Sequence, residues 1–186
     1  LDQDKGADTH ERLGPKRGLQ QGLISRSAIM RAAIFTLVLA FLAGIPLVML
    51  GGWPIVTVGV ISIFMAYAYT GGPFPLAYLG LGDLFVILFF GLVAVGGVYF
   101  LQTGQYDIEA AILGLQIGLL STVLIAINNL RDVNQDRVAN KKTLAVRFGM
   151  TFVRTEIALL LFVPFLLQIF WYARSGTMAT FLPLIF

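Results

Sequence analysis

The sequence predicts an all-α protein, a multi-pass bundle of transmembrane helices. Hydrophobic residues make up 58% of the chain and charged residues only 12%, a balance far from that of soluble domains. The apolar residues form continuous runs, most of them long enough for a helix to cross a hydrocarbon layer of about 30 Å. Strands of a membrane barrel would instead alternate apolar and polar residues over segments of about ten, so a helical bundle is favoured.

Six apolar segments account for most of the chain. They are rich in Leu, Ile, Ala and Val and contain Gly and Pro, which membrane helices tolerate. Their approximate bounds are 29–50, 54–70, 84–101, 110–127, 156–172 and 178–186. The chain opens at Leu1 without an initiator methionine and ends inside an apolar run at Phe186. We therefore expect a single transmembrane domain over residues 1–186 that is incomplete at both ends.

The basic residues predict the orientation in the membrane. Six of the thirteen Lys and Arg residues lie in residues 1–31 and six in residues 131–154. Alternate crossings of the bilayer place loops 1–28, 71–83 and 131–154 on one side, which the positive-inside rule makes cytoplasmic. A bacterial cytoplasmic (inner) membrane is the natural expectation. The net charge of +3 then follows from this topology, so the lipid bilayer is an expected partner and nucleic acid is not.

The stretch NNLRDVNQDRVANKKT, residues 128–143, follows an apolar run and carries regularly spaced acceptors. Asn128, Asp132 and Asp136 are four residues apart, and a spacing of four advances a helix by about 40° beyond a full turn. All three side chains should therefore lie along one stripe, where a cation is expected. Four basic residues surround them: Arg131, Arg137, Lys141 and Lys142.

The first loop, LDQDKGADTHERLGPKRG, repeats this order of acids followed by bases. Four membrane segments separate the two loops, and an even number of crossings returns both to the same face. Two carboxylate clusters over one cavity would repel each other, and a divalent cation would relieve that repulsion. A solvated loop that only sets the topology remains the alternative, most of all for residues 1–31.

The residue types around the two clusters indicate which cation and which ligand to expect. The clusters contain no His or Cys ligand, and oxygen ligands favour Mg²⁺ or Ca²⁺ over zinc. Mg²⁺ in particular shares its coordination shell with substrate phosphates. Neighbouring Arg and Lys side chains are useful for a polyanion such as diphosphate. Acids, metal and bases together predict a diphosphate-binding site.

A third stretch, YTGGPFPLAYLGLGDLF, residues 69–85, lies on the same predicted side. Its Gly and Pro residues break the helix and predict a connecting loop. Asp83 has a simple interpretation as an N-terminal charge of the next helix. Tyr69, Tyr78 and Asp83 nevertheless surround a loop without Lys or Arg, a composition expected of a cap over an aromatic substrate.

The second motif has the form Asn-x-x-x-Asp-x-x-x-Asp and resembles the second aspartate-rich motif of the UbiA-type intramembrane prenyltransferases. With DKGADT, GPKRG and YLGLGD, the chain is most similar to the branch that prenylates 1,4-dihydroxy-2-naphthoate. The resemblance covers nearly the whole chain and implies a UbiA-like helical bundle. It also implies an Asn and an Asp a few residues before Asp2, at the end of a preceding helix, that this sequence does not contain. We therefore expect part of the metal site to be missing and the chain alone to be inactive.

The resemblance assigns site residues within this sequence. The implied ligands of Mg²⁺ are Asn128, Asp132 and Asp136 in the second cluster, with Asp2 and Asp8 remaining from the first. The implied diphosphate-binding residues are Lys5, Arg17, Arg131, Arg137, Lys141 and Arg147. Tyr69, Tyr78 and Asp83 are the candidates for placing the aromatic acceptor. Asp83, Asn128, Asp132 and Asp136 are the expected catalytic residues.

The implied function is transfer of a polyprenyl group from polyprenyl diphosphate to 1,4-dihydroxy-2-naphthoate, with decarboxylation, giving demethylmenaquinone in menaquinone biosynthesis. Other UbiA-type enzymes, with 4-hydroxybenzoate, homogentisate or haem as the acceptor, are the nearest alternative. A cation transporter is a remote one, because it predicts acids within the spans and the first four segments contain none. A purely structural membrane subunit would not explain why acids and bases recur in the same order.

Overall fold

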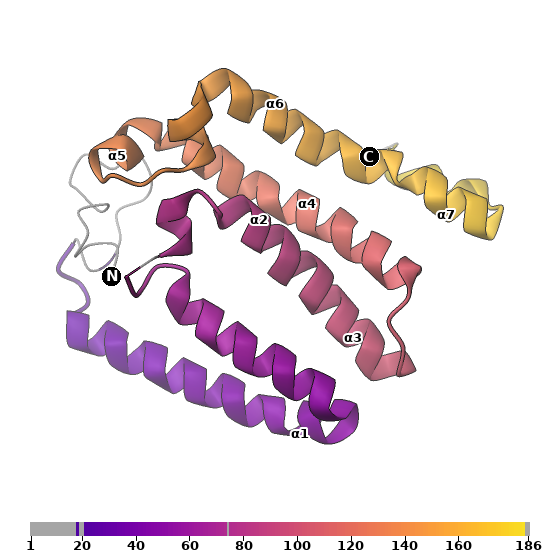
Figure 1. Ribbon diagram of the computed structural model, residues 1–186, viewed down its shortest axis with the longest axis horizontal. Helices are drawn as coiled ribbons and strands as arrows, with labels where there is room; N and C mark the ends of the chain where they lie inside the picture. Colours follow the sequence, from indigo (N-terminus) through magenta and orange to yellow (C-terminus); the bar gives the residue numbers. More distant parts are fainter. Residues whose placement is uncertain (1–17, 19–20, 74, 185–186) are drawn as a thin grey trace.

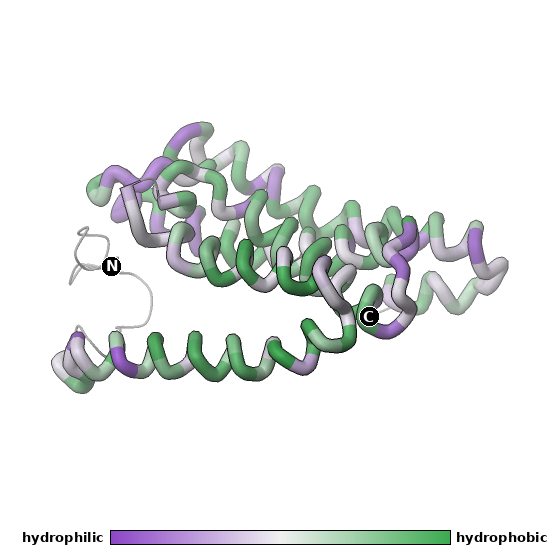
Figure 2. Tube along the Cα trace, turned by 60° about the horizontal axis from the view of Figure 1, so that its bottom comes forward, coloured by the Kyte–Doolittle hydropathy of each residue, from purple (hydrophilic) through white to green (hydrophobic). Residues whose placement is uncertain are grey.

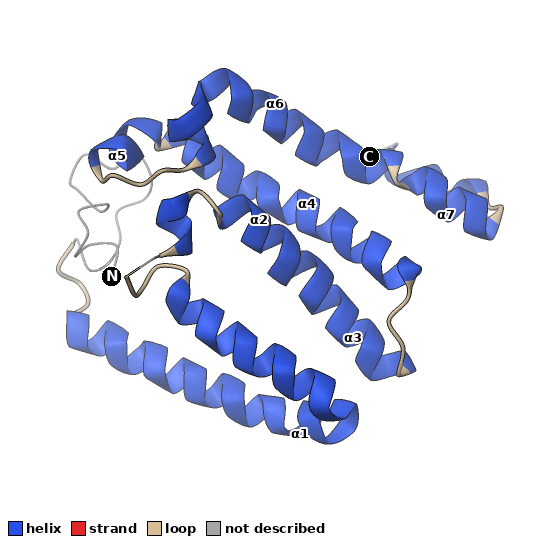
Figure 3. Cartoon of the chain, in the orientation of Figure 1, coloured by secondary structure: helices blue, strands red, loops and turns tan. Residues whose placement is uncertain are grey.

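The computed structural model of the protein describes residues 18, 21–73 and 75–184. Across these residues every regular element is a helix and none is a strand, which confirms the all-α prediction (Figure 3). Within the described ranges, four helices are long and apolar enough to cross a membrane: Arg26–Ala68, Gly82–Thr103, Ile108–Arg131 and Leu144–Ser175.

The first of these, α1 (Arg26–Ala68), is a helical hairpin. It begins where the Ser25 hydroxyl accepts a hydrogen bond from the Ala28 amide at 3.2 Å. Gly52 has φ +63° and ψ −148°, a conformation open to glycine, and Pro54 follows it. The chain therefore doubles back into two antiparallel arms (Figure 1), which correspond to the predicted spans 29–50 and 54–70.

The centre of the bundle is a close pair of helices. One is the continuous segment of α2 (Gly82–Val86), the π-helix η3 (Ile87–Val93) and α3 (Ala94–Thr103); the other is α4 (Ile108–Arg131). A Cβ atom added to Gly91 would overlap the Gly114 carbonyl oxygen, and one added to Gly118 would lie 2.7 Å from the Ile87 carbonyl oxygen. Glycines at these positions let the two backbones approach, as is usual where membrane helices pack.

The other face of α4 packs against α6 (Leu144–Leu166), which leads into α7 (Gln168–Ser175) and the 3₁₀ helix η4 (Met178–Leu184). The buried core between them contains Val123, Ala126, Val133, Ala145, Val153 and Leu160. Loop 131–154 was predicted between spans, but it contains α5 (Val133–Val138) and the start of α6. Charged residues lower the hydropathy there without preventing helix formation, and Gly149, at φ +84°, interrupts α6 inside this stretch.

Polar segments gather at the two ends of the bundle, with apolar residues between them (Figure 2). Residues 21–25, the 3₁₀ helix η2 (Leu76–Leu79) and α5 lie at one end (Figure 1). The bend of α1, the α3–α4 connection and the end of α7 lie at the other. The three loops predicted to share a side of the membrane are thus at the same end, as far as the structure describes them.

Two groups of hydrogen bonds connect the helices, one at the opposite end of the bundle and one in its middle. Asp107 caps α4 by accepting from the Ala110 amide at 2.9 Å, and the Tyr99 hydroxyl donates to it at 2.5 Å. The Tyr99 hydrogen bond is the main cause that lowers the pKa of Asp107. Deeper in the bundle, Gln116 Nε2 donates to the Pro164 carbonyl at 2.7 Å and its Oε1 accepts from Trp171 Nε1 at 2.8 Å. This buried amide ties α4 to both α6 and α7.

Candidate functional site

The second acidic motif lies at the junction of α4 and α5. Asp132 separates the two helices, with φ −94° and ψ 14°. Its amide still donates to the Asn128 carbonyl at 2.9 Å, and the Asp136 amide donates to the Asp132 carbonyl at 2.8 Å. Helical spacing therefore continues through the junction, and the three motif residues occupy successive turns.

The two carboxylates of this motif each face a basic side chain of the same segment. Asp132, whose side chain is 20% exposed, accepts from Arg131 Nε at 2.6 Å and from Arg131 Nη2 at 2.7 Å. Asp136 is buried, and its Oδ1 lies 3.5 Å from Lys141 Nζ. Burial raises the pKa of Asp136, and the nearby Lys141 ammonium opposes that effect. Asn128, by contrast, is exposed.

These residues fit part of a magnesium site. Carboxylate oxygens are the ligands that Mg²⁺ prefers, and Asp136 Oδ2 is buried without a hydrogen-bond partner in the described part of the chain. Among the residues that the structure describes, no group of three or more His, Cys, Asp or Glu is close enough to hold a metal ion. Asp132 and Asp136 would therefore supply only some of the ligands. The other predicted residues of this site, Asp2, Lys5, Asp8 and Arg17, lie outside the described residues.

The loop between α5 and α6 is docked onto η2, which joins the second motif to the third. The Lys142 amide donates to the Tyr78 carbonyl at 3.0 Å. Arg147 Nη2 donates to the Leu79 carbonyl at 2.8 Å, and Arg147 Nε donates to the Lys142 carbonyl at 3.1 Å. Of the basic residues predicted to bind diphosphate, Arg147 is thus bonded to backbone, while Arg137 is exposed on α5.

Asp83 is one of the most buried polar residues near this junction. It lies in the first turn of α2, as its simpler interpretation predicted, but it is only 5% exposed. Its Oδ1 has no hydrogen-bond partner within the described ranges, which an ordinary helix-terminal charge in solvent would not show. Asp83 lines a polar cavity of about 10 Å³, room for one water molecule, together with Tyr69, Asn129, Lys141 and Thr143.

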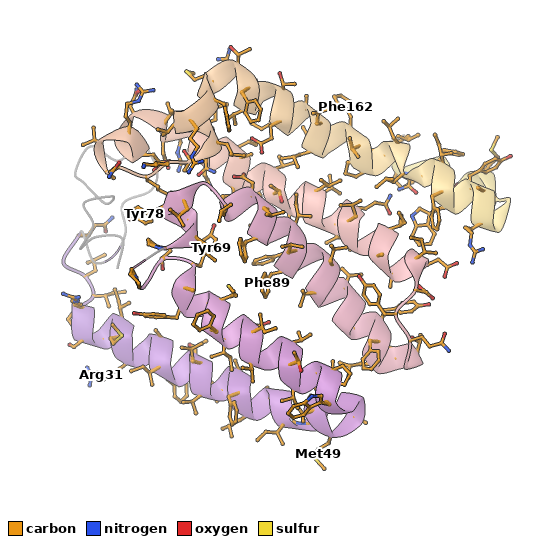
Figure 4. The ribbon with its side chains drawn as sticks, in the orientation of Figure 1. Arg31, Met49, Tyr69, Tyr78, Phe89 and Phe162 are labelled. Atoms are coloured by element: carbon orange, nitrogen blue, oxygen red, sulfur yellow. The ribbon has the colours of Figure 1, made fainter. Side chains whose placement is uncertain are left out.

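The structure brings the predicted acceptor-site residues to the same end of the bundle. Tyr69 and Asp83 share the polar cavity, and the Tyr69 hydroxyl lies 3.1 Å from where a Cβ of Gly82 would be. Tyr78 is buried in η2 and is attached to the α5–α6 loop through its carbonyl (Figure 4). Lys141 lines the Asp83 cavity and also pairs with Asp136, so the two predicted sites are adjacent.

A second, larger cavity of about 480 Å³ opens beside Tyr69, between the second arm of α1 and the α2–η3 segment. Phe89 lies on the side of that segment which faces α1 (Figure 4), and its ring stacks with Phe85 at a centroid distance of 6.0 Å. The lining is almost wholly apolar: Ser62, Met65, Ala66, Tyr69, Leu76, Phe85, Val86, Phe89 and Phe90. An apolar or aromatic ligand can therefore lie next to Tyr69, which also lines the Asp83 cavity.

Sequence reasoning missed Glu156, an acid within the membrane-spanning part of α6. Its Oε2 is buried and lacks a hydrogen-bond partner among the described residues. An ionisable side chain in a membrane span is a functional candidate by default. The signal in the sequence is one acid at the first position of the apolar run 156–172.

Comparisons with known proteins identify the family to which the chain belongs. The model of the UbiA prenyltransferase family matches residues 1–186. The chain is 42% identical over 154 residues to a 1,4-dihydroxy-2-naphthoate octaprenyltransferase of Haemophilus influenzae, covering 80% of the chain and 50% of that protein. It is 42% identical over 163 residues to the enzyme of that name from Escherichia coli, covering 84% and 53%.

A third relative, the 1,4-dihydroxy-2-naphthoate octaprenyltransferase of Mycobacterium tuberculosis, is 39% identical over 145 residues, covering 78% of the chain and 49% of that protein. The chain thus spans about half the length of the curated relatives it matches. No solved structure gives a significant match. The described residues include four long apolar helices, and the chain is an integral membrane protein. The predicted resemblance is confirmed, because this chain belongs to the UbiA prenyltransferase family.

Proposed function

We propose that the protein transfers a polyprenyl group from polyprenyl diphosphate to 1,4-dihydroxy-2-naphthoate with loss of the ring carboxylate, forming demethylmenaquinol, the reduced form of demethylmenaquinone. The names of the relatives above support this choice of acceptor. The observation that carries the proposal is the junction of the acidic motif at Asp132 and Asp136 with the buried Asp83. Next to that junction is the aromatic-lined cavity that contains Phe89.

The donor would bind at the end of the bundle where α5 lies. Asp132, Asp136 and the amide oxygen of Asn128 would hold Mg²⁺, completed by Asp2 and Asp8 of the first cluster. When bound, Mg²⁺ supplies positive charge that neutralises the diphosphate leaving group. Arg131 and Lys141 now balance the two carboxylates, and they would turn to the diphosphate oxygens when those carboxylates bind metal. Lys5, Arg17 and Arg137 are the other basic residues proposed for the diphosphate.

The chemical step needs a dry cavity with a placed acceptor. The allylic C–O bond of the donor breaks, its electron pair leaves with the diphosphate, and the aromatic lining beside Tyr69 shelters the prenyl cation from water. The acceptor ring then forms the new C–C bond. The bond to its carboxylate breaks, CO₂ leaves, and the electron pair of that bond restores the aromatic ring. Asp83, whose Oδ1 is a buried and unused acceptor in the described structure, would orient the ring by accepting from a ring hydroxyl, with Tyr69 and Tyr78 beside it.

The same arrangement supports a location and an orientation. Residues 21–25, η2 and α5 gather at one end of the bundle, and six of the thirteen basic residues belong to loop 131–154, which contains α5. We propose that this end faces the cytoplasm of a bacterial cell and that the bundle lies in its cytoplasmic (inner) membrane. The prenyl tail would extend from the cavity between the helices toward lipid.

The test is a transfer assay in membranes carrying the chain, alone and extended to the full length of its relatives. Polyprenyl diphosphate is supplied with 1,4-dihydroxy-2-naphthoate, 4-hydroxybenzoate or homogentisate, with Mg²⁺ or with a chelator, and products are identified by mass spectrometry. We expect Mg²⁺-dependent product from the naphthoate, and a loss of about 10³-fold or more in Asp132→Ala. Glu109→Gln, which alters a carboxylate at the opposite end of the bundle, is the matched control.

Two outcomes would contradict the proposal. Parental turnover in Asp132→Ala would remove this cluster from the metal site. Transfer to another acceptor but not to the naphthoate would leave the prenyltransferase chemistry in place and overturn the choice of substrate.

A further inference from the structure

We infer that Arg147 is a positioning residue that locks the α5–α6 loop onto the η2 turn, and that it does not act as a diphosphate ligand. The inference rests on the proposed function, because the two segments that Arg147 joins carry the donor-site and acceptor-site residues. It reassigns a residue that charge and motif had placed with the diphosphate-binding group.

The geometry is that of a two-pronged clamp. Although Arg147 is an exposed residue, its Nη2 donates to the Leu79 carbonyl at 2.8 Å and its Nε to the Lys142 carbonyl at 3.1 Å. Leu79 is 68 positions away in the sequence. The rigid, planar guanidinium suits such a double contact, whereas the single ammonium of lysine has no fixed fork. Between the two prongs, the Lys142 amide donates to the Tyr78 carbonyl at 3.0 Å.

Gly80 shows independently that this junction must be close. It has φ +72°, a left-handed conformation that glycine adopts readily. A Cβ atom at this position would overlap the Lys142 carbonyl oxygen and would lie 3.3 Å from Arg147 Nε. An alanine here would therefore push apart the two segments that Arg147 holds together, without changing any charge.

The Arg147 clamp positions the residues that lie between the proposed donor site and the proposed acceptor site. On the loop side, Lys141 pairs with Asp136, and Thr143 is 2% exposed. On the turn side, the chain passes from Gly80 to Asp83 within three residues. Lys141, Thr143 and Asp83 line one cavity with room for a single water molecule, so a shift of about 1 Å at the junction would separate them.

The experiment compares Arg147→Lys, Gly80→Ala and the double variant in the protein extended to the length of its relatives. We expect each single change to lower kcat/KM for the naphthoate by about 10- to 100-fold, the scale associated with a misplacement of about 1 Å. Because both changes open one junction, the double variant should lose little more than either single variant. Arg154→Lys on α6 and Gly97→Ala, which meets open space, are the matched controls and should keep parental values.

Hydrogen exchange supplies a readout that does not depend on turnover. The Lys142 amide, which is bonded to Tyr78, should exchange faster in both single variants while the core amides of α4 keep their parental rates. The exchange rates test the inference even if the parent forms no naphthoate product. That lack of product would contradict the proposed function but not the clamp. Parental kcat/KM in Arg147→Lys, losses that multiply in the double variant, or unchanged Lys142 exchange would each overturn the clamp.

Discussion

Replacing Lys141 by Met tests whether Lys141 neutralises the carboxylate of Asp136 that a bound metal ion would otherwise neutralise. Lys141 Nζ lies 3.5 Å from Asp136 Oδ1, and the two side chains are 24% and 8% exposed. At that distance and an effective dielectric constant of about 20, the attraction is about 5 kcal/mol before desolvation is subtracted. Desolvation offsets most of it, so we expect removal of the lysine to strengthen binding of bare Mg²⁺ by about 1–2 kcal/mol, or roughly 5- to 30-fold.

The same variant should weaken binding of pyrophosphate in the presence of Mg²⁺, because the proposed second role of Lys141 is to contact the diphosphate. Both affinities can be measured by calorimetry on detergent-solubilised protein, with Mn²⁺ and electron paramagnetic resonance as a check on the metal. Lys142→Met also removes one positive charge, at the next position, where the side chain is exposed. It is therefore the matched control and should change both affinities less. If Lys141→Met binds Mg²⁺ no more tightly than Lys142→Met, the idea that lysine and metal compete for Asp136 is wrong.

Two further predictions concern the packing that supports the site. Gln116→Leu should lower the free energy of unfolding by about 1–3 kcal/mol, because the Pro164 carbonyl and Trp171 Nε1 each lose their hydrogen bond to the buried amide. Thermal unfolding in detergent measures this loss, and Gln102→Leu, at an exposed position, should not show it. Gly91→Val should destabilise the bundle by about 3 kcal/mol or more, because the new side chain would overlap the backbone of α4. Gly97→Val is the control, because its side chain would meet open space. Equal melting temperatures for these two variants would contradict the close packing of η3 on α4.

The α5–α6 loop connects these predictions to function. Lys141 belongs to the charge balance at Asp136, and the next residue, Lys142, is bonded through its backbone to η2. A change in metal occupancy at Asp136 would therefore act on a segment that also forms the wall of the Asp83 cavity. Under the proposed function, donor binding and acceptor placement would be coupled through the three residues 141–143.

The sequence alone determined the class of the protein and its family, because both depend on local patterns. Apolar runs predict membrane helices through their length, and the four-residue spacing of Asn128, Asp132 and Asp136 predicts a common stripe through the pitch of the helix. The backbone hydrogen bonds through the α4–α5 junction confirm that spacing. The Asn-x-x-x-Asp-x-x-x-Asp motif was also specific enough to predict the family, which the family match confirms.

Only the tertiary structure decided what each charged residue does. In the sequence, Arg147 is a basic residue near the acidic motif, which predicts a phosphate ligand. In the fold, it clamps two segments together because η2 brings the Leu79 carbonyl to it from 68 positions away. Glu156 is only the first residue of an apolar run in the sequence, and the fold buries its Oε2 without a hydrogen-bond partner among the described residues. Burial, pairing and desolvation depend on contacts between distant segments, and no pattern within one segment contains them.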